Sequence, residues 1–439
     1  MNWFKISLQL NKFPITRAQK LLREIQNIPE KDYQKYLEDQ RKSIVNFHLT
    51  HNSFYRNFFS NNYFTRWEDV PVMQKSDLQR PLLERFSKSF SKNNSYIGKT
   101  SGSSGHPFIF AKDRFSHALT WAEFIDRYNW IDIDLNRSLQ ARFYGIPLDF
   151  YGNLTERFKD RVSLRRRFNV FDLSERKMLV FLERFRKSKF DYINGYTSAI
   201  VLFAKYLEKH QFVLKEICPS LKVCIVTSEK LFENDKLLIE KFFGVPVVNE
   251  YGASEVGLIS FENSNMEWIV NSESLFIEIL DDNNRILPFG EEGRIVITSL
   301  YNKAHPMIRY DIGDTGSLSP SSTWKKPILE NLTGRTNDVA KLANGKVVPG
   351  LTFCYVTKSI IEDAGSIKEF VIVQTSTDTF KIEYVSEKEF SQTQVQKILF
   401  AIETFVGKDL NVCFERKDVL QRNKSGKLKQ FTSLIQENL

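Results

Sequence analysis

The hydrophobic and polar positions in the first part of the chain follow a helical period. In Ile15–Gln26, "ITRAQKLLREIQ", apolar residues return every three or four positions and polar residues fill the other face. A similar pattern continues to about Asn62. We therefore predict that the N-terminal part of the chain is helical.

Two short apolar runs enclose a helical segment in the middle of the chain. The runs are Leu221–Ser228, "LKVCIVTS", and Val245–Gly252, "VPVVNEYG". The segment between them has helical spacing and ends at Gly244, which is a typical helix stop. This order predicts a strand–helix–strand unit of a parallel sheet. Such sheets bind ligands at the carboxyl ends of their strands, where "TSE" and "EYGASE" stand.

The pattern changes after about residue 265. The segments "LFIEIL" and "RIVITSL", with the turn "DDNNRILPFGEEG", alternate as in an antiparallel barrel or small sheet. From Asn337 onward, short strands and one helix predict a compact α+β unit of about 100 residues. We predict an α/β protein whose large N-terminal domain holds parallel and mixed sheets plus a small β-barrel. A smaller, mobile α+β domain follows; the predicted parts are residues 1–95, 96–336 and 337–439.

Composition indicates a folded protein with more than one domain. The chain has 439 residues, of which 42% are hydrophobic and 26% charged. No apolar run approaches the roughly 18 residues of a membrane span, and the N-terminus lacks the features of a signal peptide. The four cysteines form no CxxC pair, which argues against a metal site or a disulfide framework. These features favour a cytoplasmic protein.

The net charge of +9 is partly concentrated in two segments, Glu156–Phe168 and Glu183–Phe190. One interpretation is a solvated helical face. The other is a binding surface for a polyanion such as a nucleotide tail, a sugar phosphate or an acidic membrane surface, so peripheral membrane contact stays open. Nucleic acid is not favoured as a partner, because the basic runs lack a recognition motif. The sequence makes no prediction of the oligomeric state.

The segment Gly98–Phe108, "GKTSGSSGHPF", has the composition of a phosphate-binding loop. Its glycines let backbone N–H groups turn toward an anion, and its hydroxyls add donors. It is not a P-loop of the nucleotide triphosphatases, because Asn93 stands where that motif requires glycine. Taken alone, the segment is equally well interpreted as a Ser/Gly connector.

Four further motifs follow this loop in order: "EYGASE" (250–255), "IRYDIGD" (308–314), "LTGRTND" (332–338) and "NKSGKLKQF" (423–431). Each alone has an ordinary structural explanation. Together with the loop they resemble the adenylate-forming enzymes, which comprise acyl-CoA synthetases, aryl-CoA ligases and adenylation domains. The segments "SLYNKAHPMIRYDIGDTG" and "LKVCIVTSEKL" are similar to the phenylacetate–CoA ligase branch, including members associated with capsular polysaccharide. The resemblance extends from about Tyr96 to the C-terminus.

The resemblance implies Mg-ATP-dependent activation of a small carboxylic acid as an acyl-adenylate, with release of pyrophosphate. Such chemistry needs fixed donors and cations where charge develops on the phosphates. The acyl group would then pass to an acceptor, with coenzyme A as the default. Two alternatives stay open. One is an amide- or ester-forming ligase that uses an amine or hydroxyl acceptor to decorate a capsular or O-antigen polysaccharide precursor. The other is a non-catalytic nucleotide- or polysaccharide-binding protein.

The resemblance also implies which residues bind ATP and the metal. Ser228 and Glu229 would line the adenine pocket, and Tyr251 would border adenine. Glu255 would ligate Mg²⁺, which prefers hard oxygen ligands, and Asp314 would accept hydrogen bonds from both ribose hydroxyls. The full implied ATP-binding set is Thr100, Ser101, Gly102, Ser103, Ser104, Gly105, Ser228, Glu229, Tyr251, Gly252, Ser254 (toward the α-phosphate) and Asp314.

Further implied residues belong to the phosphate loop's exit, the hinge and the C-terminal domain. Phe108 stands where many relatives have a lysine after the loop's proline, so this cation is absent or supplied by another residue. Arg335 would contact ribose or phosphate, and Asn337 would be the hinge, where many relatives have aspartate. Lys427 would be the mobile catalytic lysine, reaching the site only in the adenylation pose, with Lys429 as the alternative register.

Less can be inferred about the acid and the acceptor. Phe143, Tyr144 and Tyr196 fall where relatives build the acyl pocket, which would suit an aryl or modestly polar acid. The alternative is that they are ordinary core aromatics. The basic run 165–167 lies between the two pocket segments in the sequence, so we predict that these arginines border the acceptor entrance.

Overall fold

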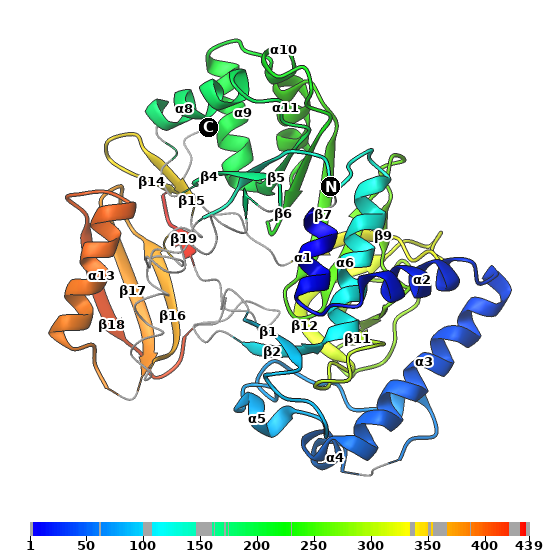
Figure 1. Cartoon of the computed structure of the whole chain (residues 1–439). Helices are drawn as coiled ribbons and strands as arrows, with labels where there is room; N and C mark the ends of the chain where they lie inside the picture. Colours follow the sequence, from blue (N-terminus) through cyan, green and yellow to red (C-terminus); the bar gives the residue numbers. More distant parts are fainter. Residues whose placement is uncertain are drawn as a thin grey trace. The chain divides into compact units, whose positions relative to one another are not determined.

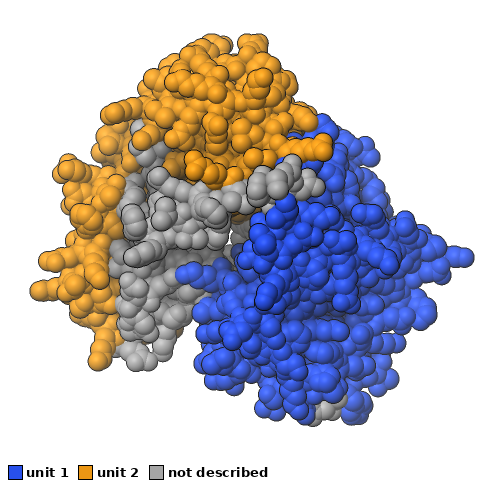
Figure 2. Space-filling model, viewed as in Figure 1, with its two compact units in different colours: residues 1–100, 108–136, 249–334 blue, residues 101–107, 137–248, 335–439 orange. Residues whose placement is uncertain are grey.

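The computed structural model describes residues 3–60, 63–99, 108–145, 160–161, 163–170, 173, 175–229, 231–333, 339–349, 353, 367–386, 388–420 and 431–435. The chain has a mixed α/β fold with a large N-terminal domain and a smaller C-terminal domain, as predicted. Its residues also group into two compact units (Figure 2). Unit 1 comprises residues 1–100, 108–136 and 249–334, and unit 2 comprises residues 101–107, 137–248 and 335–439. The predicted domain boundaries after residues 95 and 336 stay predictions.

Helices form the N-terminal part of unit 1, so the helical prediction for this region is confirmed (Figure 1). Proline precedes both α2 and α3, and a preset φ suits the entry of a helix. Asn52 begins the next helix by accepting a hydrogen bond from the Tyr55 backbone N–H at 2.8 Å. The elements are α1 (Trp3–Leu10), α2 (Ile15–Gln26), α3 (Glu30–His51), α4 (Ser53–Phe58), η1 (Trp67–Asp69) and α5 (Leu82–Arg85).

The remainder of unit 1 is built from antiparallel strands and one long helix. The hairpin of β1 (Ser95–Lys99) and β2 (Ile109–Asp113) leads directly into α6 (Arg114–Asn129). Asp113 caps that helix by accepting hydrogen bonds from the N–H groups of Phe115 and Ser116, both at 2.9 Å. Two antiparallel groups follow: β7 (Val247–Ala253), β8 (Gly257–Glu262) and β9 (Trp268–Val270), then β10 (Leu275–Leu280), β11 (Gly293–Ser299), β12 (Tyr310–Leu318) and β13 (Leu329–Thr333).

Parallel strands form the centre of residues 137–248 in unit 2. Their order is β4 (Arg165–Phe168), β3 (Gln140–Phe143), β5 (Tyr192–Tyr196) and β6 (Val223–Thr227). The helices are α8 (Glu175–Arg186), α9 (Thr197–Lys209), α10 (Leu214–Ile217) and α11 (Glu233–Phe243). The predicted order of strand, helix and strand is confirmed, because α11 lies between β6 and β7 and ends at Gly244 with φ of 66°.

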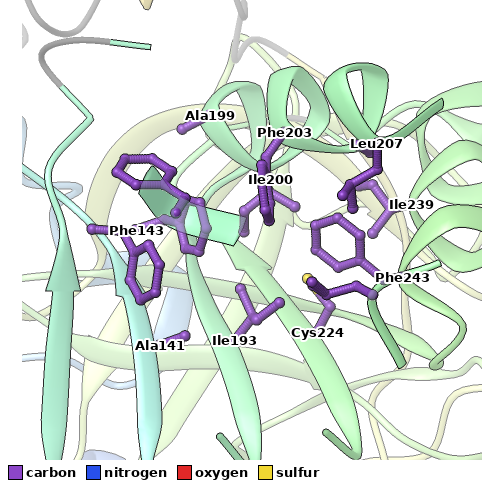
Figure 3. Close-up of a cluster of buried hydrophobic side chains, with 14 of the residues drawn as sticks. Ala141, Phe143, Ile193, Ala199, Ile200, Phe203, Leu207, Cys224, Ile239 and Phe243 are labelled. Atoms are coloured by element: carbon purple, nitrogen blue, oxygen red, sulfur yellow. The ribbon is translucent and has the colours of Figure 1, made fainter. Parts of the chain in front are cut away.

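A core of apolar side chains joins these strands to their helices. Figure 3 shows Ala141, Phe143, Ile193 and Cys224 from the strands facing Ile200, Phe203, Leu207, Ile239 and Phe243 from α9 and α11. All nine side chains are fully buried. Burial of each large apolar side chain contributes about 1.5–3 kcal/mol, so this packing fixes the strands whose carboxyl ends carry the predicted site.

The C-terminal residues form the predicted α+β structure. A hairpin of β14 (Val339–Lys341) and β15 (Val347–Pro349) precedes a four-stranded sheet in the order β18 (Asn411–Arg416), β17 (Thr379–Ser386), β16 (Ile367–Gln374) and β19 (Phe431–Ser433). Helix α13 (Gln392–Phe405) begins with a capping box between Ser391 and Gln394. Apolar residues of β16, β17 and α13 share one core. No helix within the described ranges has the length and apolarity that a bilayer crossing requires.

Candidate functional site

Two of the predicted motifs meet in unit 1 through a reciprocal pair of hydrogen bonds. Tyr251, near the end of β7, donates its hydroxyl to Asp314 Oδ2 of β12 at 2.9 Å. Tyr310, at the start of β12, donates its hydroxyl to Glu255 Oε1, in the turn after β7, at 3.2 Å. The tyrosine of each motif therefore binds the carboxylate of the other, although the paired residues are 63 and 55 positions apart in the sequence.

All four side chains of this reciprocal pair are buried. Tyr251, Tyr310 and Asp314 are each 1% exposed, and Glu255 is 7% exposed. Burial, followed by the negative charge of Glu255, raises the pKa of Tyr310 well above its ordinary value. The phenol therefore stays protonated and donates, which compensates part of the cost of burying a carboxylate.

A tight turn brings Glu255 to this position. Gly252 has no room for a side chain, because a Cβ would lie 2.9 Å from the Gly257 carbonyl oxygen. Gly257 itself has φ of 104°, which side-chain-bearing residues rarely adopt. Ser254 is exposed on the turn. The structure thus explains the glycine of "EYGASE" by backbone packing, while the predicted ATP contacts of Gly252 and Ser254 stay predictions.

The two adenine-pocket residues have different environments at the end of β6 in unit 2. Ser228 is exposed and has φ of 71°, in the left-handed region. Glu229 is buried and accepts hydrogen bonds from the N–H and the hydroxyl of Ser198, at 2.6 and 3.0 Å. Burial raises the pKa of Glu229, and the two hydrogen bonds from Ser198 oppose this shift. The Glu229 carboxylate therefore binds the N-terminal turn of α9 and ties it to the end of β6.

The three residues predicted for the acyl pocket all lie in, or pack against, one hydrophobic core of unit 2. The Phe143 ring stacks on Phe168 with centroids 4.8 Å apart, inside the core of unit 2. Tyr144 and Tyr196 have ring centroids 4.6 Å apart, and the Arg142 guanidinium lies 4.4 Å from the Tyr144 centroid. Successive strand residues point to opposite faces, so Arg142 belongs to the face opposite Phe143. Tyr196 is also a buried member of this core, and Tyr144 packs against it. The core interpretation therefore fits all three residues, and the pocket roles of the tyrosines stay predictions.

The basic run predicted to border the acceptor entrance is largely held by protein partners. Arg165 and Arg167 form ion pairs with Asp160, with N–O distances of 3.3 and 2.8 Å. Arg166 is exposed and donates a hydrogen bond to Ser188 Oγ at 2.6 Å. Two of these arginines thus stabilise the region around the strand that carries them. The interpretation of this run as a solvated helical face is wrong in its helical part, because Arg165–Phe168 form β4; only Arg166 is exposed there.

Several predicted residues lie outside the described residues, and their roles stay predictions. They are the phosphate-loop residues Thr100, Ser101, Gly102, Ser103, Ser104 and Gly105, together with Arg335, Asn337, Lys427 and Lys429. Conversely, sequence reasoning missed the functions of Tyr310 and Ser198, which orient Glu255 and Glu229. Tyr310 stood inside a quoted motif, but the residue that it binds could not be identified without the fold.

Glu255 fits the way in which Mg²⁺ is bound together with ATP. The described ranges contain no group of three or more His, Cys, Asp or Glu residues that could hold a metal ion. Mg²⁺ in nucleotide sites is commonly held by one or two carboxylates plus the substrate's phosphates. A single buried carboxylate, oriented by Tyr310 through Oε1, suits this arrangement.

Known proteins share sequence and fold with this chain. Residues 344–433 match the family of the CapK C-terminal domain. Over 422 residues the chain is 20% identical to protein CapK of Staphylococcus aureus, covering 93% of this chain and 90% of that protein. Over 227 residues it is 26% identical to a phenylacetate–coenzyme A ligase of Aromatoleum evansii, covering 48% and 51% of the two chains.

A solved structure shares the fold along nearly the whole chain. It is 2-hydroxyisobutyryl-CoA ligase in complex with 2-HIB-AMP and CoA in the thioesterification state, with a TM-score of 0.55 and 17% identity. The alignment covers 93% of this chain and 91% of that one. The resemblance predicted from the motifs is therefore confirmed: this chain has the fold of the adenylate-forming ligases, with CapK and the phenylacetate–CoA ligases among its relatives.

Proposed function

We propose that this protein uses Mg-ATP to activate a small carboxylic acid as an acyl-adenylate, and then transfers the acyl group to an acceptor, by default coenzyme A. The observation that carries the proposal is the reciprocal pair, Tyr251 to Asp314 and Tyr310 to Glu255. It brings the implied ribose carboxylate and the implied metal carboxylate into one buried cluster within unit 1.

In the proposed first step, an oxygen of the substrate carboxylate attacks the α-phosphorus of ATP. The bond from this phosphorus to the oxygen that bridges to the β-phosphate breaks, and pyrophosphate leaves. Asp314 would hold the ribose hydroxyls while its Oδ2 keeps the hydrogen bond from Tyr251. Glu255 would hold Mg²⁺, which would neutralise negative charge on the phosphates. The phosphate loop, Arg335 and Lys427 would add donors where charge develops in the transition state.

The identity of the acceptor is the open part of this proposal. Similarity to phenylacetate–coenzyme A ligase supports coenzyme A, but it extends over 48% of the chain. Similarity to CapK extends over 93% of the chain and includes the C-terminal domain. This wider match keeps an amine or hydroxyl acceptor, such as one on a polysaccharide precursor, as the alternative.

Hydroxylamine trapping tests the first step for any acceptor. Wild-type protein is incubated with Mg-ATP, hydroxylamine and a panel of aryl, hydroxy and aliphatic acids, and hydroxamate and pyrophosphate are measured. We expect at least one acid to give both products, and the positive acid is then offered coenzyme A, amino acids and nucleotide sugars. If Mg-ATP binds by calorimetry but no acid reacts, the non-catalytic nucleotide-binding alternative is favoured.

A further inference from the structure

A lysine lies buried behind the turn that carries Glu255. Lys112, on β2, is 3% exposed, and it shares its strand face with the buried Phe108 and Phe110. Its ammonium donates a hydrogen bond to Thr120 Oγ1 of α6 at 3.4 Å. An ammonium has three N–H donors, and a buried charge without adequate partners is costly. A lysine therefore occupies a position where an apolar residue would be less costly.

The acidic groups around Lys112 come from three elements of unit 1. Burial lowers the pKa of Lys112 to about 8, and this shift is opposed by Glu123 of α6, Glu255 of the turn and Asp113 at the end of β2, in that order. Lys112 forms no ion pair with any carboxylate of the described residues. The ammonium thus lies among acidic groups without being neutralised by direct contact with one of them.

The backbone after Glu255 packs directly on this ammonium. A Cβ on Gly257 would lie 3.2 Å from Lys112 Nζ and 2.8 Å from Thr120 Cγ2. Glycine at this position therefore lets the turn approach both the lysine and α6. The ammonium lies against the residue two positions after Glu255, so a movement of Lys112 would displace the turn that carries the carboxylate.

We propose that Lys112 is a positioning residue: its buried positive charge holds the turn Glu255–Gly257 against α6 and orients the Glu255 carboxylate to receive Mg²⁺ with ATP. The part of this inference that concerns Mg²⁺ rests on the proposed function. The contact with the turn and the electrostatic coupling to Glu255 are independent of that function. A direct role in place of the missing loop cation is not part of the proposal, because Lys112 lies four residues, about 13 Å, along the strand from Phe108.

The direction in which metal affinity changes shows whether Lys112 positions Glu255 or only adds a nearby positive charge. Mn²⁺ binding to the complex with a non-hydrolysable ATP analogue is measured by electron paramagnetic resonance for Lys112→Met. We expect the dissociation constant of Mn²⁺ to rise at least fivefold, because Glu255 loses its orientation. If Lys112 only added a nearby positive charge, its removal would make the site more negative. The Mn²⁺ dissociation constant would then stay unchanged or fall, and either result would overturn the proposal.

Lys303→Met is the matched control for this measurement. Lys303 is an exposed lysine of the same unit, and its ammonium lies 5.1 Å from the centroid of the Phe47 ring. This substitution makes the same chemical change as Lys112→Met but leaves the positive charge behind the Glu255 turn in place. We expect its Mn²⁺ dissociation constant to stay within twofold of wild type.

A double-mutant cycle tests the coupling without any ligand. The thermal unfolding midpoint is measured for wild type, Lys112→Met, Glu255→Gln and the double variant. The shift caused by Lys112→Met should be smaller in the Glu255→Gln background than in wild type, and equal shifts would overturn the coupling. If wild type binds no Mg-ATP, the proposed function fails while the cycle still decides whether Lys112 holds Glu255.

Discussion

Asp314 is the residue whose replacement tests the nucleotide site most directly. Asp314 is buried, accepts a hydrogen bond from Tyr251, and is the carboxylate proposed to bind the ribose hydroxyls. We expect Asp314→Ala to weaken ATP binding by about 2–3 kcal/mol, because two charge-assisted hydrogen bonds are lost together. Calorimetric titration measures this change.

Tyr251→Phe controls for disturbance of the Asp314 environment. It removes the hydroxyl that donates to Asp314 and leaves the carboxylate in place. We expect it to reduce stability by about 1–3 kcal/mol through the unpaired acceptor, with a smaller effect on ATP. Unchanged ATP affinity in Asp314→Ala would show that "RYDIGD" does not bind ribose.

Glu123 determines part of the pH dependence of stability. Burial raises its pKa to about 8, from an ordinary value of 4.5, while Ser274, Arg127 and Lys112 act to lower it and Glu273 acts to raise it. Between pH 4.5 and 8 the folded protein keeps a proton that the unfolded chain releases. Glu123 therefore favours the folded state most below pH 4.5, and this contribution is lost as the pH rises to about 8.

We predict that Glu123→Gln flattens this dependence. Urea unfolding from pH 5 to 8 should show a shallower decline of stability in the variant than in wild type, because glutamine has no proton to release. The opposite shift at Lys112, whose pKa is lowered to about 8, acts above this range. Parallel pH profiles for the two proteins would contradict the prediction.

At the scale of elements, the hydrogen bonds of Glu229 join β6 to the start of α9. Glu229→Ala removes the acceptor of the Ser198 N–H and hydroxyl, both in the first turn of the helix. Loss of such a cap and of buried hydrogen bonds costs about 1–3 kcal/mol. We expect urea unfolding to show a loss of this size for Glu229→Ala.

Glu233→Ala is the control for this prediction. Glu233 is an exposed acidic residue in the first turn of the neighbouring α11. Its replacement should change stability by no more than about 0.5–1 kcal/mol, the range of a helix-dipole contribution. Equal losses for the two variants would show that Glu229 has no special structural role.

Some helices and strands could be predicted from the pattern of apolar and polar residues alone. The helical period of Ile15–Gln26 and the stop at Gly244 predicted α2 and the end of α11, because period and helix ends are local properties. Which face of a strand is buried depends on residues far away in the sequence. Phe143 packs against Phe181 of α8 and Phe203 of α9, whereas Arg142 belongs to the opposite face of its strand. Packing against these two helices decided which face of the strand is covered.

At the scale of the whole molecule, Lys427 is predicted to act only when the C-terminal domain adopts the adenylation pose. This expectation comes from the family resemblance, since Lys427 lies outside the described residues. We expect Lys427→Ala to abolish ATP–pyrophosphate exchange and to leave ATP binding nearly unchanged, because the cation serves charge that develops during transfer.

Lys429→Ala is the matched control, with the same change two positions away. It should keep most of the exchange activity if the register is correct. If Lys427→Ala keeps near-normal exchange and Lys429→Ala loses it, the catalytic lysine is Lys429. Near-normal exchange in both variants would exclude a catalytic lysine in this motif.

The local elements, and the resemblance to the adenylate-forming enzymes through five motifs in order, could be identified without a structure. Helical period, glycine stops and motif order are properties of neighbouring residues, so they need no fold to be recognised. The tertiary structure decided which residues meet. Tyr251 binds Asp314, Tyr310 binds Glu255, and Lys112 lies behind the turn, because strands distant in the sequence pack together. Such contacts depend on the three-dimensional course of the whole chain and leave no periodic signal along it.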